Sequence, residues 1–545
     1  MMNNISTILL LLLLGQIIAA SPTTDEDSQQ LRRPLVRSVT KSSSCQPHHI
    51  HLSVGRIQNA THSSMTVSFT IPLECVKKGA GKQSIGAVRL MTSGEQSGGT
   101  QEDIMLITGN INSTRTYGAM SPRRGVDRYY SDVYHHIELE DLRPDVHYSY
   151  QCLLLKKQDI HTNMTMTSSQ YLRQKDRTTL QTIDNSNIIA QSDISSFTTP
   201  PAPGQWPAGR SITFAVIGDL GVKSHSRQTI RHLDKHRKGF DAVLFAGDLA
   251  YPSKDHENWD KWMEMMSKRS FFSAIPTQIA LGNHDLDTYK HKWSYSPDDT
   301  VMIASAYEHR FHMPQVRPAI RKRAVMSGFT IDGQPKDFIQ YDYGNAYYSF
   351  TFGPSKHIVL NSFTSFREGS LQYDWLLSEL KSIDRSVTPW LIVMLHCPLY
   401  TTFKTHRHEI FLTEAQAILE PLFVEYNVNF VIAGHVHAYM RTHPVAFSRR
   451  NPRGPIYLIQ GNGGKAVNEP YHNETAEEWV AVRDQTQYGY GTLELCNVTH
   501  AKWTLVNTGH DDAEVEPDVT LDEVWVKNQL YNEEMAVNKD WEDSV

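Results

Sequence analysis

The feature that most constrains this chain is a series of five apolar, strand-like runs, each leading into a polar residue that is able to bind a metal ion. The runs and the residues that follow them are 212–217 with Asp219, 242–246 with Asp248, 276–281 with Asn283, 390–395 with His396 and 430–433 with His435. Helical stretches such as 374–382 and 414–426 lie between them, and strands that alternate with helices predict an α/β domain. Because open α/β sheets bind ligands at the carboxyl ends of their strands, we expect these side chains to meet at one edge.

The residue types at these strand ends favour metal binding over ordinary loop structure. One Gly-Asp or Asn-His pair is a common turn. Five successive strand ends with Asp, Asn or His form a set of oxygen and nitrogen donors that suits Zn, Mn or Fe. Glycine beside these residues, as in Gly218-Asp219 and Gly247-Asp248, lets the backbone approach a metal closely. The set therefore predicts a metal site assembled from loops.

The region before this domain carries a different pattern. Short segments that alternate apolar and polar residues, such as 65–71 and 146–152, predict a β-sandwich over residues 45–200. The Pro-rich stretch that closes this region predicts a stiff linker. The α/β domain is predicted over residues 210–508, and residues 509–545 are predicted to form an acidic C-terminal tail.

The first 20 residues predict a signal peptide. An apolar run begins at Ile8 and extends to Ile18, and small residues suited to cleavage follow it. The run is interrupted and shorter than the ~20 apolar residues of a membrane helix, so we expect no membrane span after signal cleavage. Residues 21–44 are polar and predict a flexible leader. We therefore expect a secreted, extracellular protein or one in a lysosome-like compartment.

Cysteines and glycosylation sequons agree with export. Three of the five cysteines, Cys45, Cys75 and Cys152, lie in the first third of the chain, so we expect one disulfide there and leave its pairing open. Cys397, beside His396, is interpreted as a small buried residue rather than a nucleophile. Asn-x-Ser/Thr sequons predict glycosylation at Asn59, Asn112, Asn163, Asn473 and Asn497.

The motifs together resemble the metallophosphoesterase superfamily and, within it, the plant-type purple acid phosphatases. They are Gly-Asp-Leu-Gly at 218–221, Gly-Asp-Leu-Ala-Tyr at 247–251, Gly-Asn-His-Asp at 282–285, the His396 segment at 388–400 and Gly-His-Val-His at 434–437. Tyr251, three residues after Asp248, is the residue that points to the purple acid phosphatases. The resemblance implies an α/β metallophosphoesterase sandwich of two mixed β-sheets flanked by helices, preceded by an all-β fibronectin-III-like sandwich domain.

The resemblance also implies a dinuclear metal centre. Fe(III) would be held by Asp219, Asp248, Tyr251 and His437. A divalent ion, Zn, Mn or Fe(II), would be held by Asp248, Asn283, His396 and His435, so that Asp248 is shared. Two carboxylates, a phenolate and an imidazole form a hard, anionic set that suits Fe(III), and the less charged second set suits a divalent ion.

The activity implied by the resemblance is that of a secreted acid phosphatase, which hydrolyses phosphate monoesters through a metal-bound hydroxide. His284 matches a substrate-facing histidine that would bind phosphate or protonate the leaving group, and Asp285 would orient it. His406 matches one of two adjacent histidines that contact the leaving group in plant-type relatives, and Thr405 stands in place of the other.

The expected partners are small phosphorylated substrates, and the resemblance is compatible with a homodimer. The formal net charge of −6 argues against a nucleic-acid partner, because phosphate backbones require a basic face. Two alternatives stay open. A phosphodiesterase or nucleotide pyrophosphatase would use the same centre, and a non-catalytic binding protein would keep the fold with the β-sandwich as an adhesive module.

Overall fold

The structure is a computed structural model. It describes residues 45–77, 84–96, 99–109, 114–120, 128–156, 185–252, 256–286, 303–316, 337–509 and 519–531. The predicted signal peptide, the leader, and the sequons at Asn112 and Asn163 lie outside these residues. Within the described residues, no helix combines the length and the apolar content that crossing a bilayer requires.

The N-terminal region is an all-β sandwich. One sheet has the strand order β1-β2-β8-β5, and the other has the order β10-β9-β3-β4, with β11 also paired with β9. Their bounds are β1 His48–Gln58, β2 Ser63–Ile71, β3 Ser84–Gln96, β4 Gly99–Thr108, β5 Thr114–Arg115, β8 Val133–Leu142, β9 His147–Lys156, β10 Ile188–Gln191 and β11 Ser195–Thr198. A short hairpin joins β6 (Gly118–Met120) to β7 (Arg128–Tyr130). Apolar side chains of both sheets, such as Val67 and Tyr150, form one buried cluster between them.

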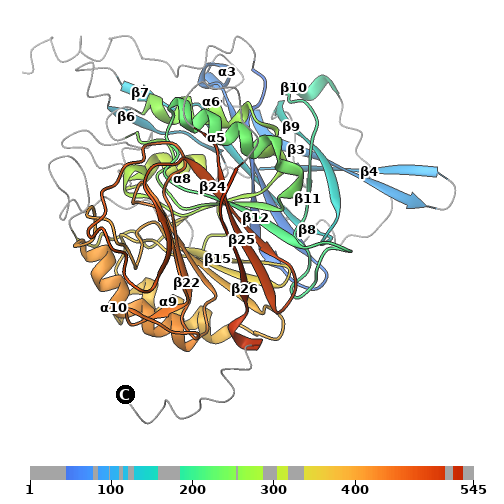
Figure 1. The fold of residues 1–545 in the computed structure, drawn as a ribbon. Coiled ribbons are helices and arrows are strands. Elements are labelled where there is room, and N and C mark those ends of the chain that lie inside the picture. The colour runs from blue at the N-terminus through green and yellow to red at the C-terminus, as the bar shows by residue number, and fades with distance from the viewer. Residues whose placement is uncertain are drawn as a thin grey trace, which may run out of the picture.

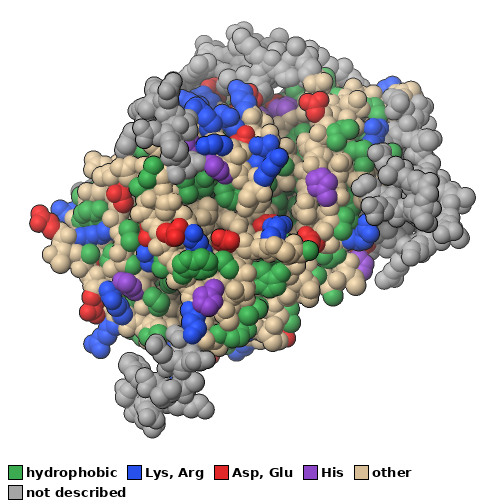
Figure 2. Space-filling view, turned by 45° about the vertical axis from the view of Figure 1, so that its right-hand side comes forward, with side chains coloured by type: hydrophobic (Ala, Val, Ile, Leu, Met, Phe, Trp, Pro, Cys, Tyr) green, Lys and Arg blue, Asp and Glu red, His purple; other side chains and the backbone are tan. Residues whose placement is uncertain are grey.

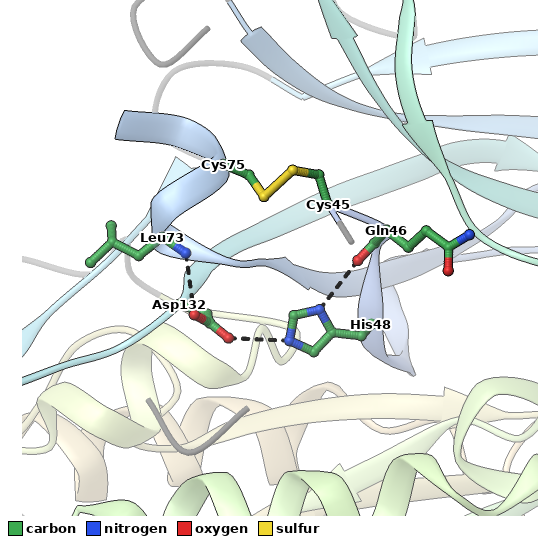
Figure 3. Close-up of a disulfide and its surroundings, with 6 residues drawn as sticks. All are labelled: Cys45, Gln46, His48, Leu73, Cys75 and Asp132. Atoms are coloured by element: carbon green, nitrogen blue, oxygen red, sulfur yellow. Dashed lines mark hydrogen bonds and ion pairs between the residues drawn. A yellow bond between two sulfur atoms is a disulfide. The ribbon is translucent and has the colours of Figure 1, made fainter. Parts of the chain in front are cut away.

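A disulfide fixes the start of this sandwich. Cys45 and Cys75 are joined and tie the chain before β1 to helix α3 (Leu73–Lys77), which follows β2 (Figure 3). The Asp132 carboxylate lies beneath the bridge, accepting the backbone N–H of Leu73 at 3.2 Å and lying 3.1 Å from Nε2 of His48. The expected disulfide is confirmed, and the third cysteine of this region is a buried thiol.

The C-terminal region contains two mixed sheets, with strand orders β14-β13-β12-β24-β25-β26 and β15-β16-β17-β18-β22-β19-β23. The first consists of β12 Ile212–Ile217, β13 Ala242–Phe245, β14 Thr277–Ile279, β24 Gly489–Leu495, β25 His500–Asn507 and β26 Val519–Lys527. The second consists of β15 Tyr348–Phe352, β16 Ser355–Val359, β17 Trp390–Met394, β18 Phe430–Ala433, β19 Tyr439–Thr442, β22 Ile456–Gln460 and β23 Val480–Asp484. The short strands β20 (Val445–Ala446) and β21 (Arg449–Arg450) form a separate hairpin.

Helices flank these sheets. They are α5 Ser224–Lys235, α6 Glu257–Ser267, α7 Ser270–Ala274, α8 Ser305–Arg310, α9 Leu371–Ser382 and α10 Ile410–Glu425. Figure 1 shows α5 and α6 on one side of the sheets and α9 and α10 on the other. This architecture confirms the predicted fold class of two mixed sheets with flanking helices behind an all-β region.

The burial of β17 explains why its sequence is a continuous apolar run. Every residue of Trp390–Met394 is buried. Ile392 belongs to the cluster that contains Phe214 of the first sheet, whereas Leu391 belongs to the cluster that contains Leu419 of α10. A strand that is covered on both faces needs apolar residues at every position, unlike the half-exposed strands of an open sheet.

The predicted acidic tail is wrong for Val519–Lys527, which forms β26 and pairs with β25 over its whole length. The acidic composition hid an alternating strand pattern. Asp522 is buried, and Arg441 of the other sheet donates to its carboxylate from Nε at 2.7 Å and from Nη2 at 2.9 Å. The charge that suggested a solvated tail is therefore neutralised inside the fold.

The surface is polar and mixed in charge. Acidic and basic side chains of the described residues are interspersed over the face shown in Figure 2. Three of the predicted glycosylation sites are described, and Asn59, Asn473 and Asn497 are all exposed. Their positions leave room for a glycan, which requires a surface location.

A buried ionic cluster joins the sandwich to the C-terminal region. Arg310 at the end of α8 is fully buried, and its Nη2 donates to Asp260 at 3.0 Å and to the hydroxyl of Tyr129 at 2.8 Å. The Tyr129 hydroxyl donates in turn to Asp260 at 2.7 Å, and Nη1 of Arg310 donates to Tyr117. Tyr117 and Tyr129 come from the sandwich region, so the guanidinium of Arg310 forms hydrogen bonds between the two regions.

We predict that Arg310→Met lowers the free energy of unfolding by about 3–5 kcal/mol, because it leaves the buried carboxylate of Asp260 without its cation. Urea unfolding measures the change. Arg367→Met is the matched control: Arg367 forms an ion pair with Glu414 at the surface, and its loss should change stability little. Equal effects of the two substitutions would contradict the role given to Arg310.

Candidate metal centre

Polar side chains that follow strands of both C-terminal sheets lie together in one cluster. The first sheet supplies Asp219 after β12, Asp248 after β13 and Asn283 after β14, and the second supplies His396 after β17 and His435 after β18. Tyr251 and His437 follow within the same loops. All seven side chains selected from the sequence are therefore brought together, as the carboxyl ends of parallel strands require.

The loops that carry these side chains have an unusual backbone. Asp219, Asp248, Tyr251 and His435 have φ values of 53°, 54°, 50° and 70°, a region that residues with a side chain rarely adopt. A Cβ atom on Gly282 would lie 2.1 Å from Oδ1 of Asp248, so only glycine fits beside that carboxylate. Several strained residues in one cluster are a common property of functional sites.

The first set of donors surrounds the hydroxyl of Tyr251. It donates to Oδ1 of Asp219 at 2.9 Å and lies 2.9 Å from Nε2 of His437. Oδ2 of Asp219 accepts the backbone N–H of His435 at 2.8 Å. Phenol, carboxylate and imidazole thus converge on a common point.

The second set surrounds the amide oxygen of Asn283. Oδ1 of Asn283 lies 3.1 Å from Nε2 of His396 and 3.0 Å from Nδ1 of His435. Nε2 of His396 is also 3.5 Å from Oδ1 of Asp248. Ligand atoms of Asp219, Asp248 and His396 lie within 4.8 Å of one another, so the two sets adjoin at Asp248.

Hydrogen bonds outside the cluster orient the two imidazoles of the second set. Nδ1 of His396 donates to the carbonyl oxygen of Ala246 at 2.7 Å, which leaves the lone pair on Nε2 directed into the cluster. Nε2 of His435 lies 2.9 Å from Oε2 of Glu409, so its Nδ1 faces the cluster. Metal-binding histidines are commonly held this way, and the donor sets therefore fit a pair of metal ions.

The protonation states also suit metal ligands. Burial raises the pKa of Asp248, but His396 and His284 outweigh it and hold the pKa below its ordinary value. Burial lowers the pKa of His435 to about 4, so its imidazole is neutral. Burial and the neighbouring carboxylates raise the pKa of Tyr251 well above its ordinary value. A cation at the phenol oxygen would offset those carboxylates and favour the phenolate.

Glu409 is a site residue that sequence reasoning missed. Its Oε1 lies 2.6 Å from Nδ1 of His406, while its Oε2 contacts His435, and the two imidazole rings are 3.9 Å apart. Burial raises the pKa of Glu409, but the hydrogen bonds to both histidines lower it below the ordinary value. In the sequence, Glu409 is one acidic residue before a helix, which is a common place for a cap.

The predicted catalytic residues lie in different surroundings. The side chain of His284 is 27% exposed, and its ring is 4.6 Å from that of Tyr251. Asp285 is fully buried and accepts the backbone N–H groups of Asp248, Leu249 and Gly282 at 2.9, 3.0 and 3.0 Å. Asp285 therefore joins two ligand-bearing loops, and its orientation of His284 stays a prediction.

Cys397 and Thr405, which the sequence also singled out, are neighbours of His396 and His406 in the chain. Cys397 is buried as expected, and burial raises the pKa of its thiol, which argues against a thiolate nucleophile. Thr405, which stands in place of a histidine, donates its hydroxyl to Glu469.

Two family models match the chain. The model described as Calcineurin-like phosphoesterase covers residues 212–439, which include all seven predicted ligands. The model described as Iron/zinc purple acid phosphatase-like protein C covers residues 454–516.

Several similar proteins come from plants. Purple acid phosphatase 18 of Arabidopsis thaliana is 33% identical over 335 residues, which are 61% of this chain and 65% of the relative, just under two thirds of its length. Probable purple acid phosphatase 20 of the same plant is 32% identical over 337 residues, which are 62% of this chain and 68% of the relative. The structure of a purple acid phosphatase from yellow lupin (Lupinus luteus) seeds shares the fold, with a TM-score of 0.62 at 19% identity over 87% of this chain and 74% of the lupin chain.

We predict that Glu409→Gln lowers the affinity of the second donor set for Zn by about 10–100-fold, as is typical when the partner of a metal-binding histidine is lost. The amide that replaces the carboxylate has only one oxygen. It therefore accepts a hydrogen bond from one of the two histidines and turns its N–H group toward the other. Calorimetric titration of metal-depleted protein measures the affinity. Glu414→Gln, in the helix that follows Glu409, is the control, because Glu414 pairs with Arg367 at the surface. Unchanged affinity in Glu409→Gln would contradict this account.

Proposed function

This chain belongs to the purple acid phosphatase family, and from that premise we propose that it is an acid phosphatase that hydrolyses phosphate monoesters. The observation that carries the proposal is the convergence of seven side chains in two donor sets that adjoin at Asp248. We assign Asp219, Asp248, Tyr251 and His437 to Fe(III). We assign Asp248, Asn283, His396 and His435 to a divalent ion, for which Zn, Mn and Fe(II) are the candidates.

The donor chemistry supports this division. The first set contains a phenol and two carboxylates and is the more anionic, which suits a trivalent ion. The second set contributes one amide and two imidazoles besides the shared carboxylate, which suits a divalent ion. Fe(3+)-Zn(2+) purple acid phosphatase 12 of Arabidopsis thaliana, 28% identical over 348 residues, carries such a metal pair in its name. When bound, two such ions activate water and neutralise charge on a phosphate ester.

The histidines at the open side of the centre supply binding and proton transfer. His284 is partly exposed next to Tyr251, where it would hydrogen-bond a phosphate oxygen or donate a proton to the leaving group. His406 is also 27% exposed, and Glu409 engages its Nδ1 so that Nε2 is left for the leaving group. Thr405, hydrogen-bonded to Glu469, would leave that contact to His406 alone.

We further propose that the protein is exported, to the cell exterior or to a lysosome-like compartment. The Cys45–Cys75 disulfide supports this, because disulfides persist in oxidising compartments. Exposed sequons at Asn59, Asn473 and Asn497 agree with glycosylation along that route.

The test of the proposed activity compares two substrates. At acid pH the purified, metal-replete protein should hydrolyse p-nitrophenyl phosphate with a higher kcat/KM than bis(p-nitrophenyl) phosphate, because a monoester offers more charged oxygens to two ions. His396→Ala should lose most activity toward both, whereas His500→Ala, at an exposed position on β25, should retain it. A preference for the diester would favour a phosphodiesterase. No turnover of either substrate would favour a non-catalytic binding protein.

A further inference from the structure

A lysine that the sequence motifs do not include lies against the proposed iron ligand. Nζ of Lys465 is 4.2 Å from the centroid of the Tyr251 ring, a distance typical of a cation–π contact. Lys465 is partly buried, and among the described residues no carboxylate forms an ion pair with it. The ammonium group therefore contacts the face of the aromatic ring, and the carboxylate of Asp248 attracts it from beyond ion-pair distance.

The fold holds Lys465 in this place through its backbone. The N–H of Lys465 donates to the carbonyl oxygen of Asp219 at 2.9 Å, and the N–H of Gly463 donates to that of Gly218 at 3.1 Å. The loop after β22 is thus hydrogen-bonded to the loop after β12, which carries a proposed metal ligand. A shift of the Lys465 backbone would therefore require a shift of the Asp219 loop.

The aliphatic part of the lysine packs beside the tyrosine ring. A Cβ atom on Gly221 would lie 3.5 Å from both Cδ of Lys465 and Cδ2 of Tyr251, so the three residues share one contact region. Gly221 has a φ of 69°, which favours glycine there. The lysine stem can therefore run past Gly221 and place its charge over the ring face.

We propose that Lys465 is a positioning residue that acts through Tyr251, by raising the energy of the charge transfer from the tyrosine ring to iron. The proposal rests on the Tyr251–iron bond of the proposed function. The face of an aromatic ring carries negative charge, so a cation over the face stabilises the electrons of the ring.

The same geometry gives the direction of a spectral effect. In a tyrosinate-to-Fe(III) charge-transfer transition, one electron leaves the ring and moves to the ion at the phenol oxygen, at the edge of the ring. The ammonium lies over the face, so the electron moves away from the positive charge, and the transition needs more energy. Removal of the charge should therefore shift the visible band to longer wavelength.

Visible spectra of the iron-containing protein test the proposal, with iron content measured on the same samples. Lys465→Met keeps an unbranched stem and removes the charge, and its band should lie at longer wavelength than that of the wild type. Lys465→Arg keeps a cation that stacks on aromatic rings, and its band should stay near the wild-type position. Lys223→Met removes an exposed neighbouring lysine and should leave the band in place.

An unshifted band in Lys465→Met at wild-type iron content would overturn the proposal, as would an equal shift in Lys223→Met. If Lys465→Met loses iron, Lys465→Gln repeats the test, and loss of iron in both with retention in Lys465→Arg would support the requirement for charge. Tyr251→Phe distinguishes a failure of this proposal from a failure of the proposed function. Absence of a band in the wild type, or its persistence in Tyr251→Phe, would refute the Tyr251–iron bond itself.

Discussion

The burial of two carboxylates side by side is the constraint on which the rest of this site depends. Asp219 and Asp248 are both essentially inaccessible, and unpaired buried charges destabilise a fold strongly. Backbone N–H groups compensate part of this, since His435 donates to Asp219 and His284 donates to Asp248, each at 2.8 Å. A pair of cations would compensate the remaining cost of burying these two charges. This explains why two sheets converge on a single polar cluster.

Several side chains that are not assigned as ligands determine how the ligands are presented. Asp285 joins the backbone of two ligand-bearing loops, and Glu409 links His435 to His406. Lys465 adds a positive charge over Tyr251. Each of these residues acts by hydrogen bonding or charge on an assigned residue, so their effects should appear in metal affinity and spectra as well as in turnover.

The fold class and five of the seven candidate ligands could be predicted from the sequence because each of the five follows its own apolar strand. The other two, Tyr251 and His437, could be predicted from the resemblance of their motifs to the purple acid phosphatases. Glu409 and Lys465 could not, because their contacts depend on how distant loops approach one another. Strand β26 was hidden by its acidic residues, whose buried member Asp522 is paired with Arg441 from another sheet. The disulfide pairing likewise depended on the approach of α3 to the start of β1.

Metal analysis of the purified native protein tests the central claim most directly. The arrangement of the two donor sets predicts two metal ions per chain, one of them iron and the other Zn, Mn or a second iron. Because Asp248 belongs to both sets, Asp248→Ala should lose both ions while Asp384→Ala, at an exposed turn, should lose neither. A single ion per chain, or two ions without iron, would contradict the account.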